Sequence, residues 1–160
     1  MNEKWQERTR LLAGEKTLER YANAHVLVVG LGGVGAYAAE QLCRAGIGEM
    51  TIVDADNVDI TNINRQLLAT TESIGTSKVS VMAQRLRSIN PDIRLHEVHE
   101  FLRDEGTIRL LESTKFDYVV DAIDMVSSKL LIIKKWKECG VPVISCMGTG
   151  KKIRAELLEI

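Results

Sequence analysis

The stretch HVLVVGLGGVG, residues 25–35, places a glycine-rich segment directly after a short apolar run. The aliphatic residues at 26–29 indicate a strand that is buried on both faces, and the spacing of apolar residues over 33–45 predicts a helix. In such a turn Gly30 permits the tight bend, Gly32 lets the backbone approach a phosphate, and Gly35 allows close packing of helix on strand. The helix N-terminus then offers unpaired N–H groups to an anion.

An acidic residue lies where a nucleotide-binding fold requires one. Asp54 follows Gly30 by 24 residues, at the end of a second apolar run, residues 50–53. A carboxylate in that place can accept hydrogen bonds from ribose hydroxyls. The loop and the acid together predict nucleotide binding, and taken alone they are typical of a nicotinamide-dependent dehydrogenase.

The remaining pattern alternates strands with helices. We expect further strands at 93–98, 118–120 and 143–146, and helices at 76–89, 104–111 and 126–139. Strands separated by helices predict an α/β, Rossmann-like, doubly wound and mainly parallel sheet. Residues 2–22 read as one or two further helices. We therefore divide the chain into an N-terminal helical extension (1–24), a nucleotide-binding domain (25–150) and the start of a truncated C-terminal element (151–160).

Composition excludes several classes. The 160 residues are 45% hydrophobic and carry 21 Lys+Arg against 22 Asp+Glu, a formal net charge of -1, which argues against disorder and against a general nucleic-acid binder. There is no apolar run long enough to span a membrane, and the charged start MNEKWQERTR does not resemble a signal peptide. Three unevenly spaced cysteines form no CxxC pair. We expect a cytoplasmic protein without a membrane partner.

Three downstream features have no role in hydride transfer. They are the polar segment NINRQ (62–66), Lys78 near the start of a helix, and the pair Asp121 and Asp124 at the end of the fourth strand. Cations and a carboxylate around phosphates suit attack on phosphorus, and Asp124 is a natural Mg²⁺ ligand. Taken singly, Arg65 could be a solvated loop charge, Lys78 an ordinary first-turn lysine and Asp124 a helix N-cap.

The segments GLGGVG, VDADNVDITNINRQ, GTSKV and VVDAID, in this order, resemble the adenylating superfamily of ubiquitin-activating enzymes and the bacterial ThiF, MoeB and HesA proteins. The resemblance covers residues from about 5 to 150 and makes 25–150 an adenylation domain that uses ATP and Mg²⁺. A substrate carboxylate would attack the α-phosphorus, giving an acyl-adenylate and pyrophosphate.

The resemblance also assigns residues. It implies that the nucleotide is held by Gly30, Gly32, Gly33, Gly35, Asp54, Asp56, Asn62, Arg65, Gln66, Lys78 and Asp121. Among these, Asp54 would bind ribose and Asn62, Arg65 and Lys78 the phosphates. Asp124 would hold the metal. Arg8, with Arg10 as the neighbouring candidate, would reach the ATP of a second subunit, so that Arg8, Arg65, Lys78 and Asp124 form the catalytic set of a homodimer.

Within the superfamily, the segments at 8–48, 61–66, 78–91 and 118–129 are most similar to the tRNA threonylcarbamoyladenosine dehydratases. That family implies a tRNA substrate whose threonylcarbamoyl carboxylate is activated and then closed into a ring with loss of water. The alternative is an adenylyltransferase for a ubiquitin-like sulfur carrier, with that carrier or a cysteine-desulfurase-type protein as partner. A non-catalytic nucleotide-binding subunit and an NAD-dependent oxidoreductase are the remaining alternatives.

We also predict roles for two further sets of residues, one basic and one of cysteines. A surface for tRNA would come from an exposed basic helix face and the basic residues near the C-terminus: Lys129, Lys134, Lys135, Lys137, Lys151, Lys152 and Arg154. Cys146, near the site, is expected to be a small buried hydrophobe, and Cys43 a core residue.

Overall fold

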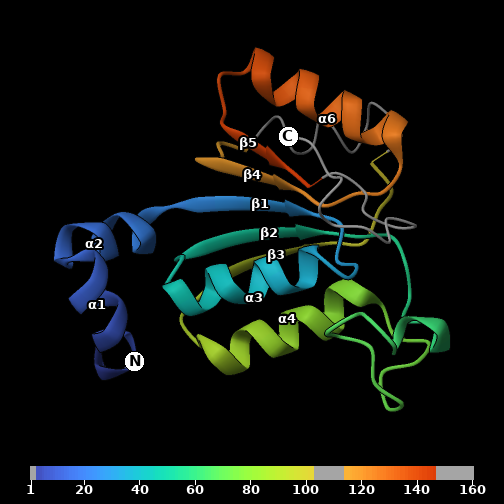
Figure 1. The fold of residues 1–160 in the computed structure, drawn as a ribbon, viewed down its shortest axis with the longest axis horizontal. Helices are drawn as coiled ribbons and strands as arrows, with labels where there is room; N and C mark the ends of the chain where they lie inside the picture. Colours follow the sequence, from blue (N-terminus) through green and yellow to red (C-terminus); the bar gives the residue numbers. More distant parts are fainter. Residues whose placement is uncertain (1–2, 103–113, 147–160) are drawn as a thin grey trace, which may run out of the picture.

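A five-stranded parallel sheet forms the centre of the computed structural model, which describes residues 3–102 and 114–146 (Figure 1). The strands lie in the order β3-β2-β1-β4-β5. Their bounds are β1 His25–Val29, β2 Glu49–Val53, β3 Arg94–Val98, β4 Tyr118–Asp121 and β5 Val143–Ser145. All four strand pairings are parallel. The predicted doubly wound, Rossmann-like α/β fold is therefore confirmed. The strands are added outward from β1 to β3 on one side, and β4 and β5 are then added on the other side of β1.

Helices cover both faces of the sheet. α3 (Gly35–Ala45) and α4 (Lys78–Ile89) lie on one face, and α6 (Val126–Glu138) lies on the other (Figure 1). Side chains of β1 alternate between the two layers: Val26 and Val28 pack in the α3/α4 core, whereas Leu27 and Val29 pack with α6. All five residues of β1 are buried, as expected for a central strand.

The N-terminal segment forms helices, as predicted: the 3-10 turn η1 (Glu3–Gln6), α1 (Glu7–Ala13) and α2 (Glu15–Asn23). They lie beyond the amino ends of the strands, at the opposite end of the sheet from the strand carboxyl ends (Figure 1). Leu18 of α2 is buried, but no residue of α1 is buried among the described residues, and Leu11 and Leu12 are 79% and 90% exposed. α1 therefore carries an uncovered apolar surface.

Several predicted boundaries shift. The first long helix begins at Gly35 instead of residue 33, because the glycine loop continues through Val34. The next helix begins at Lys78 instead of residue 76, because Ser77 forms an isolated bridge with Asn57. The predicted helix at 104–111 and the C-terminal element at 151–160 lie outside the described residues. The division of the chain at residue 24 stays a prediction, although α2 ends at Asn23 and β1 begins at His25.

Candidate active site

A cavity of about 640 Å³ opens at the carboxyl ends of the strands. Its walls come from the loops that follow β1, β2 and β4, so it lies at the point where the strand order reverses. That is where open α/β sheets bind their ligands, and the volume is that of a typical small-molecule site.

The glycine loop forms one wall of the cavity. Gly30 has φ +87°, and a Cβ there would lie 2.8 Å from the carbonyl oxygen of Ala122. A Cβ on Gly35 would overlap the carbonyl oxygen of Gly30. Gly32 and Gly33 line the cavity, and α3 begins behind them at Gly35, where the N-cap residue Val34 makes no side-chain capping hydrogen bond. The loop thus presents backbone and an uncapped helix N-terminus to a ligand, which suits phosphate.

Gly35, predicted as a nucleotide contact, does not line this cavity. Its missing side chain lets α3 approach the end of β1, since the space a Cβ would need is filled by the Gly30 carbonyl and the Ala122 side chain. Gly35 therefore affects the shape of the loop by allowing close packing of α3, without lining the cavity itself.

Asp54 ties the glycine loop to the end of β2. Its Oδ2 accepts a hydrogen bond from the Leu31 N–H at 2.6 Å, and its Oδ1 accepts one from the Asp56 N–H at 2.8 Å. A carboxylate has about four acceptor positions, so capacity remains for ribose hydroxyls in the cavity that Asp54 lines. The same residue can position the loop and bind the sugar.

Lys78 reaches the cavity from the first turn of α4. Its Nζ lies 2.9 Å from Asp56 Oδ2, and its side chain is 6% exposed whereas that of Asp56 is 56% exposed. A buried ammonium that faces the cavity and has one exposed carboxylate as its ion-pair partner can turn to a phosphate without losing a charge partner. Lys78 and Asp56 both line the cavity, which is where residues that bind a nucleotide are expected to lie.

The segment after β2 brings three more predicted residues to the cavity: Asn62, Arg65 and Gln66. Asn62 Oδ1 accepts from the Asp59 N–H and completes a capping box on η2 (Ile60–Asn62). Gln66 Oε1 is buried without a hydrogen-bond partner among the described residues. Because an orphaned buried acceptor is costly, Gln66 fits a site whose ligand donates to it.

Arg65 is held at the cavity rim. Its Nη1 donates to the carbonyl oxygen of Thr61 and to Asn64 Oδ1, both at 2.9 Å, while the side chain stays exposed. The guanidinium has five donors, so these bonds orient it and leave others for a phosphate.

Asp124 lies between β4 and α6 and faces the same cavity. The N-cap of α6 is Met125, and no side chain caps the helix. Asp124 is therefore not the N-cap of α6, and its exposed carboxylate is a hard oxygen donor available to a divalent cation.

A family model described as the ThiF family matches residues 6–153. The chain belongs to the ThiF family. It is 39% identical over 163 residues to the tRNA threonylcarbamoyladenosine dehydratase of Escherichia coli K12, matching 100% of this chain and 60% of that protein. It is 34% identical over 131 residues to a sulfur carrier protein adenylyltransferase of Thermus thermophilus, covering 82% of this chain and 48% of that protein.

A solved structure agrees with this placement. The E. coli tRNA N6-threonylcarbamoyladenosine dehydratase in complex with ATP superimposes with a TM-score of 0.91 at 40% identity, covering 96% of this chain and 63% of that one. The chain thus spans about three fifths of the length of these relatives.

Asp121 requires a correction within this ThiF-family fold. It was predicted to contact the nucleotide, but its side chain is fully buried and does not line the cavity. Its Oδ2 accepts from Lys129 Nζ at 2.7 Å and from Ser145 Oγ at 2.6 Å, and its Oδ1 accepts from the Ile123 N–H at 3.1 Å. Asp121 therefore supports the loop that carries Asp124 and lies outside the cavity.

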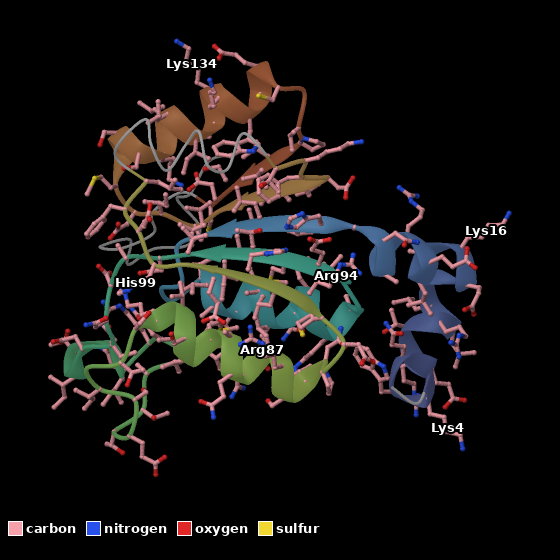
Figure 2. The ribbon with its side chains drawn as sticks, turned by 180° about the vertical axis from the view of Figure 1, so that it is seen from behind. Lys4, Lys16, Arg87, Arg94, His99 and Lys134 are labelled. Atoms are coloured by element: carbon pink, nitrogen blue, oxygen red, sulfur yellow. The ribbon has the colours of Figure 1, made fainter. Side chains whose placement is uncertain are left out.

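The prediction for Lys129, the partner of Asp121, is also wrong. It was predicted to belong to an exposed basic face, but it is 5% exposed. Its Nζ donates to Asp121, to Ser145 Oγ at 3.1 Å and to the Cys146 carbonyl oxygen at 2.9 Å. Lysines are rarely buried unless paired, and this one joins α6 to the ends of β4 and β5. The remaining described lysines of the face are Lys134 and Lys137, which are exposed, and Lys135; Figure 2 shows Lys134 pointing outward from α6.

The structure confirms the prediction for Cys43 and contradicts the one for Cys146. Cys43 is fully buried in the core, as expected, and burial raises the pKa of its thiol to about 11. Cys146 is partly exposed and lines the cavity, so its prediction as a buried hydrophobe is wrong. The short strand β5 ends at Ser145, so Cys146 lies just beyond its carboxyl end, on the side of the sheet where the cavity opens.

Arg8 lies on α1, on the far side of the sheet from the cavity of its own chain (Figure 1). It is exposed, whereas the other three predicted catalytic residues line one cavity. Within a single chain the predicted set is thus divided between two ends of the molecule.

The cavity residues that the sequence analysis did not name include a group from one further loop: Glu100, Phe101 and Leu102. They follow β3, whose carboxyl end meets that of β2 at the same edge. The rule that ligands gather beyond strand carboxyl ends, applied to the predicted strand at 93–98, would have found them.

Among the described residues, no helix is both long enough and apolar enough to cross a membrane.

Proposed function

We propose that this ThiF-family domain activates a carboxylate with ATP, and that the protein it belongs to dehydrates threonylcarbamoyladenosine in tRNA. The observation that carries the proposal is the shared cavity: the glycine loop, Lys78, Arg65 and Asp124 come from four separate segments and line one space. The relatives at about 40% identity named as tRNA threonylcarbamoyladenosine dehydratases supply the substrate class.

The roles of the residues follow from their placement. The uncapped N-terminus of α3 and the backbone of Gly32 and Gly33 receive phosphate oxygens. Lys78 and Arg65 stabilise the negative charge that grows on the phosphoryl oxygens as the substrate carboxylate attacks the α-phosphorus and pyrophosphate leaves. An internal nitrogen or oxygen of the substrate then attacks the activated carbonyl carbon and displaces AMP, so the net result is loss of one water.

The decisive experiment uses the full-length protein with ATP, Mg²⁺ and tRNA that carries threonylcarbamoyladenosine, followed by mass analysis of the nucleosides. A modified adenosine lighter by one water supports the proposal. Unchanged tRNA, together with adenylation of a ubiquitin-like sulfur carrier, would replace it with the alternative activity. ATP binding without either reaction would favour a non-catalytic subunit.

Asp124 is the residue we propose for Mg²⁺. Its carboxylate is exposed in the cavity and is not used to cap α6. We expect Asp124→Ala to lose both activity and its dependence on added Mg²⁺, because the metal loses its protein ligand. Activity measured over a Mg²⁺ titration checks this, with Asp92→Ala, an exposed acid on the loop before β3, as the control. A normal Mg²⁺ response in Asp124→Ala would move the metal to another residue.

We further propose a homodimer in which α1 of one subunit supplies Arg8 to the cavity of the other. The exposed Leu11 and Leu12 and the position of Arg8 away from its own cavity support this arrangement. Arg8→Ala and Arg65→Ala proteins should each lose most of their activity, and mixing them should restore activity, because a mixed dimer contains one complete site. Activity no greater than the sum of the separate variants would show that Arg8 does not act in trans.

We place the tRNA contact on the exposed lysines of α6 and the enzyme in the cytoplasm. α6 begins at the cavity and carries Lys134 and Lys137 on its exposed surface. These two exposed cations support a local contact with RNA phosphates, which needs no excess of positive charge over the whole chain.

A further inference from the structure

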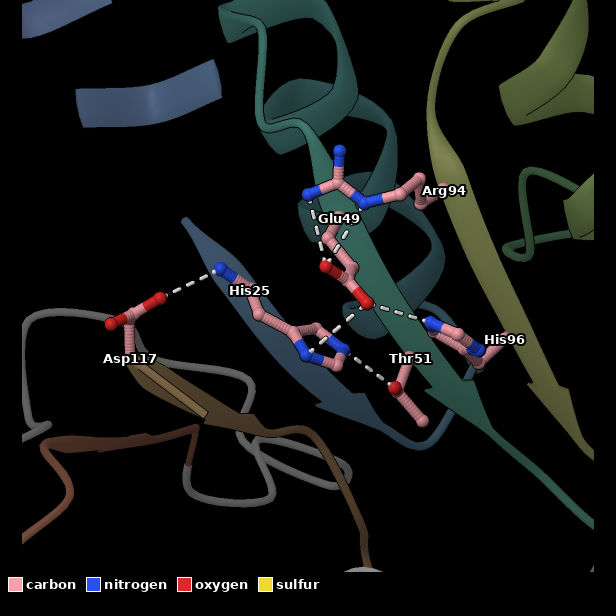
Figure 3. Close-up of polar contacts among 6 residues, drawn as sticks. All are labelled: His25, Glu49, Thr51, Arg94, His96 and Asp117. Atoms are coloured by element: carbon pink, nitrogen blue, oxygen red, sulfur yellow. Dashed lines mark hydrogen bonds and ion pairs between the residues drawn. The ribbon is translucent and has the colours of Figure 1, made fainter. Parts of the chain in front are cut away.

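Three metal-ligating side chains meet on neighbouring strands, away from the cavity. His25 is on β1, Glu49 on β2 and His96 on β3, and Figure 3 shows them pointing toward one another. Strand register explains the meeting: His25 pairs with Glu49, and His96 pairs with Thr51, two residues further along β2 on the same face. Among the described residues this is the one group of three such side chains found within metal-binding reach.

The separations suit one small cation. Glu49 Oε1 lies 2.8 Å from His96 Nε2 and 3.6 Å from His25 Nδ1, and all three ligand atoms lie within 4.8 Å of one another. Ligand atoms about 2.0–2.2 Å from a zinc ion lie about 3.4 Å apart in a tetrahedral site. Side-chain movements of about 1 Å or less would bring the three atoms to those positions, since Glu49 and His96 are only partly covered.

Neighbouring side chains orient two of the three ligands, first His25 and then Glu49. His25 Nε2 lies 2.9 Å from the hydroxyl of the buried Thr51. With the proton on Nε2 donated to that hydroxyl, the lone pair of Nδ1 faces Glu49, which is how second-shell groups orient metal-bound histidines. Burial lowers the pKa of His25, which favours the neutral ring that a metal requires.

Arg94 holds the other oxygen of the carboxylate. Its Nε and Nη2 donate to Glu49 Oε2 at 3.1 and 3.0 Å, which leaves Oε1 for the histidines (Figure 3). Hydrogen bonds from His96 and Arg94 keep the pKa of Glu49 below its usual value, so the group is a carboxylate. The remaining nearby acid, Asp117, is engaged through Oδ2 by the His25 N–H at 2.8 Å.

We propose that His25, Glu49 and His96 form a binding site for a divalent transition-metal ion, Zn²⁺ first, that joins β1, β2 and β3. The two nitrogen ligands and one carboxylate are those of known zinc sites, and the exposed side of His96 leaves a position for water. The site lies toward the Arg94 end of β3, whereas His99 marks the cavity end (Figure 2). Its role is to stabilise the sheet, independently of the proposed adenylation.

The test measures zinc affinity by competition with a chromophoric chelator, using full-length protein freed of metal and carrying Cys139→Ser and Cys146→Ser. We expect one zinc ion per chain. His96→Asn, at the exposed ligand, should weaken zinc binding by at least about 10–100-fold. His99→Asn is the matched control, because His99 is the remaining histidine of the sequence and its Nε2 lies 2.8 Å from the Ala55 carbonyl oxygen, outside the cluster. It should bind zinc as tightly as its parent.

One further measurement separates a metal site from an ion-pair network. At one fixed zinc concentration, the rise in Tm should be larger for the parent and for His99→Asn than for His96→Asn. Equal zinc affinity in His96→Asn and the parent, or a parent Tm unaffected by zinc, would overturn the proposal and leave the cluster as an ion-pair network. Neither result would bear on ATP binding.

Discussion

Replacing Lys78 with Met is expected to slow adenylation by about 10²–10³-fold, the usual effect of deleting one preorganised donor to a developing oxyanion. The aliphatic part of the buried side chain is kept, and the charge that faces the cavity is lost. ATP–pyrophosphate exchange in the presence of the acyl substrate measures the step. Arg65→Ala should give a loss of similar size, because its guanidinium lines the same cavity.

The control for Lys78 is its ion-pair partner. Asp56 is 56% exposed, so Asp56→Asn should leave folding nearly unchanged while also breaking the pair. If Lys78 mattered only as the partner of Asp56, the two variants would lose exchange equally. A Lys78→Met protein with undiminished exchange would remove the lysine from the phosphate site.

Lys129→Met should lower the free energy of unfolding by about 3–5 kcal/mol, because it leaves the carboxylate of Asp121 buried without its cationic partner. Asp121 is 0% exposed and Lys129 5%, and the lysine also satisfies Ser145 Oγ and the Cys146 carbonyl oxygen. For a chain of this length the Tm should fall by roughly 10 °C. Urea unfolding of parent and variant measures the change.

Lys134→Met, an exposed lysine on the same helix, is the matched control and should change stability by less than about 0.5 kcal/mol. The double variant Asp121→Asn with Lys129→Met should recover part of the loss, since no unpaired charge then remains. Equal stabilities of Lys129→Met and Lys134→Met would mean that Lys129 is solvated, as the sequence first indicated.

Much of the fold was predictable because each element carries its own local pattern. The apolar run at 26–29, the glycine loop and the helix after it depend on residues that are neighbours in the chain, so their identity follows from periodicity and turn chemistry. Most predicted nucleotide-site residues also reach the cavity, because the carboxyl ends of parallel strands meet at one edge.

The errors share a physical cause. Lys129 lies in a run of helical residues whose pattern does not reveal which face meets the sheet, and its partner Asp121 is eight residues earlier on β4. The sequence indicated two separate charges, one for a ligand and one for RNA. Only packing of α6 on β4 and β5 brings them together and removes both from solvent. Cys146 was misjudged for the same reason, because its exposure depends on where β5 ends.

The sequence by itself therefore determined the strand–loop–helix unit, the order of the elements and the set of phosphate-binding candidates, since these follow from short-range pattern and from the direction of parallel strands. The tertiary structure decided which charges face the cavity and which are paired beneath it. It also brought His25, Glu49 and His96 together across three strands. Strand register and helix packing join residues that are far apart in the chain, and no local pattern records those contacts.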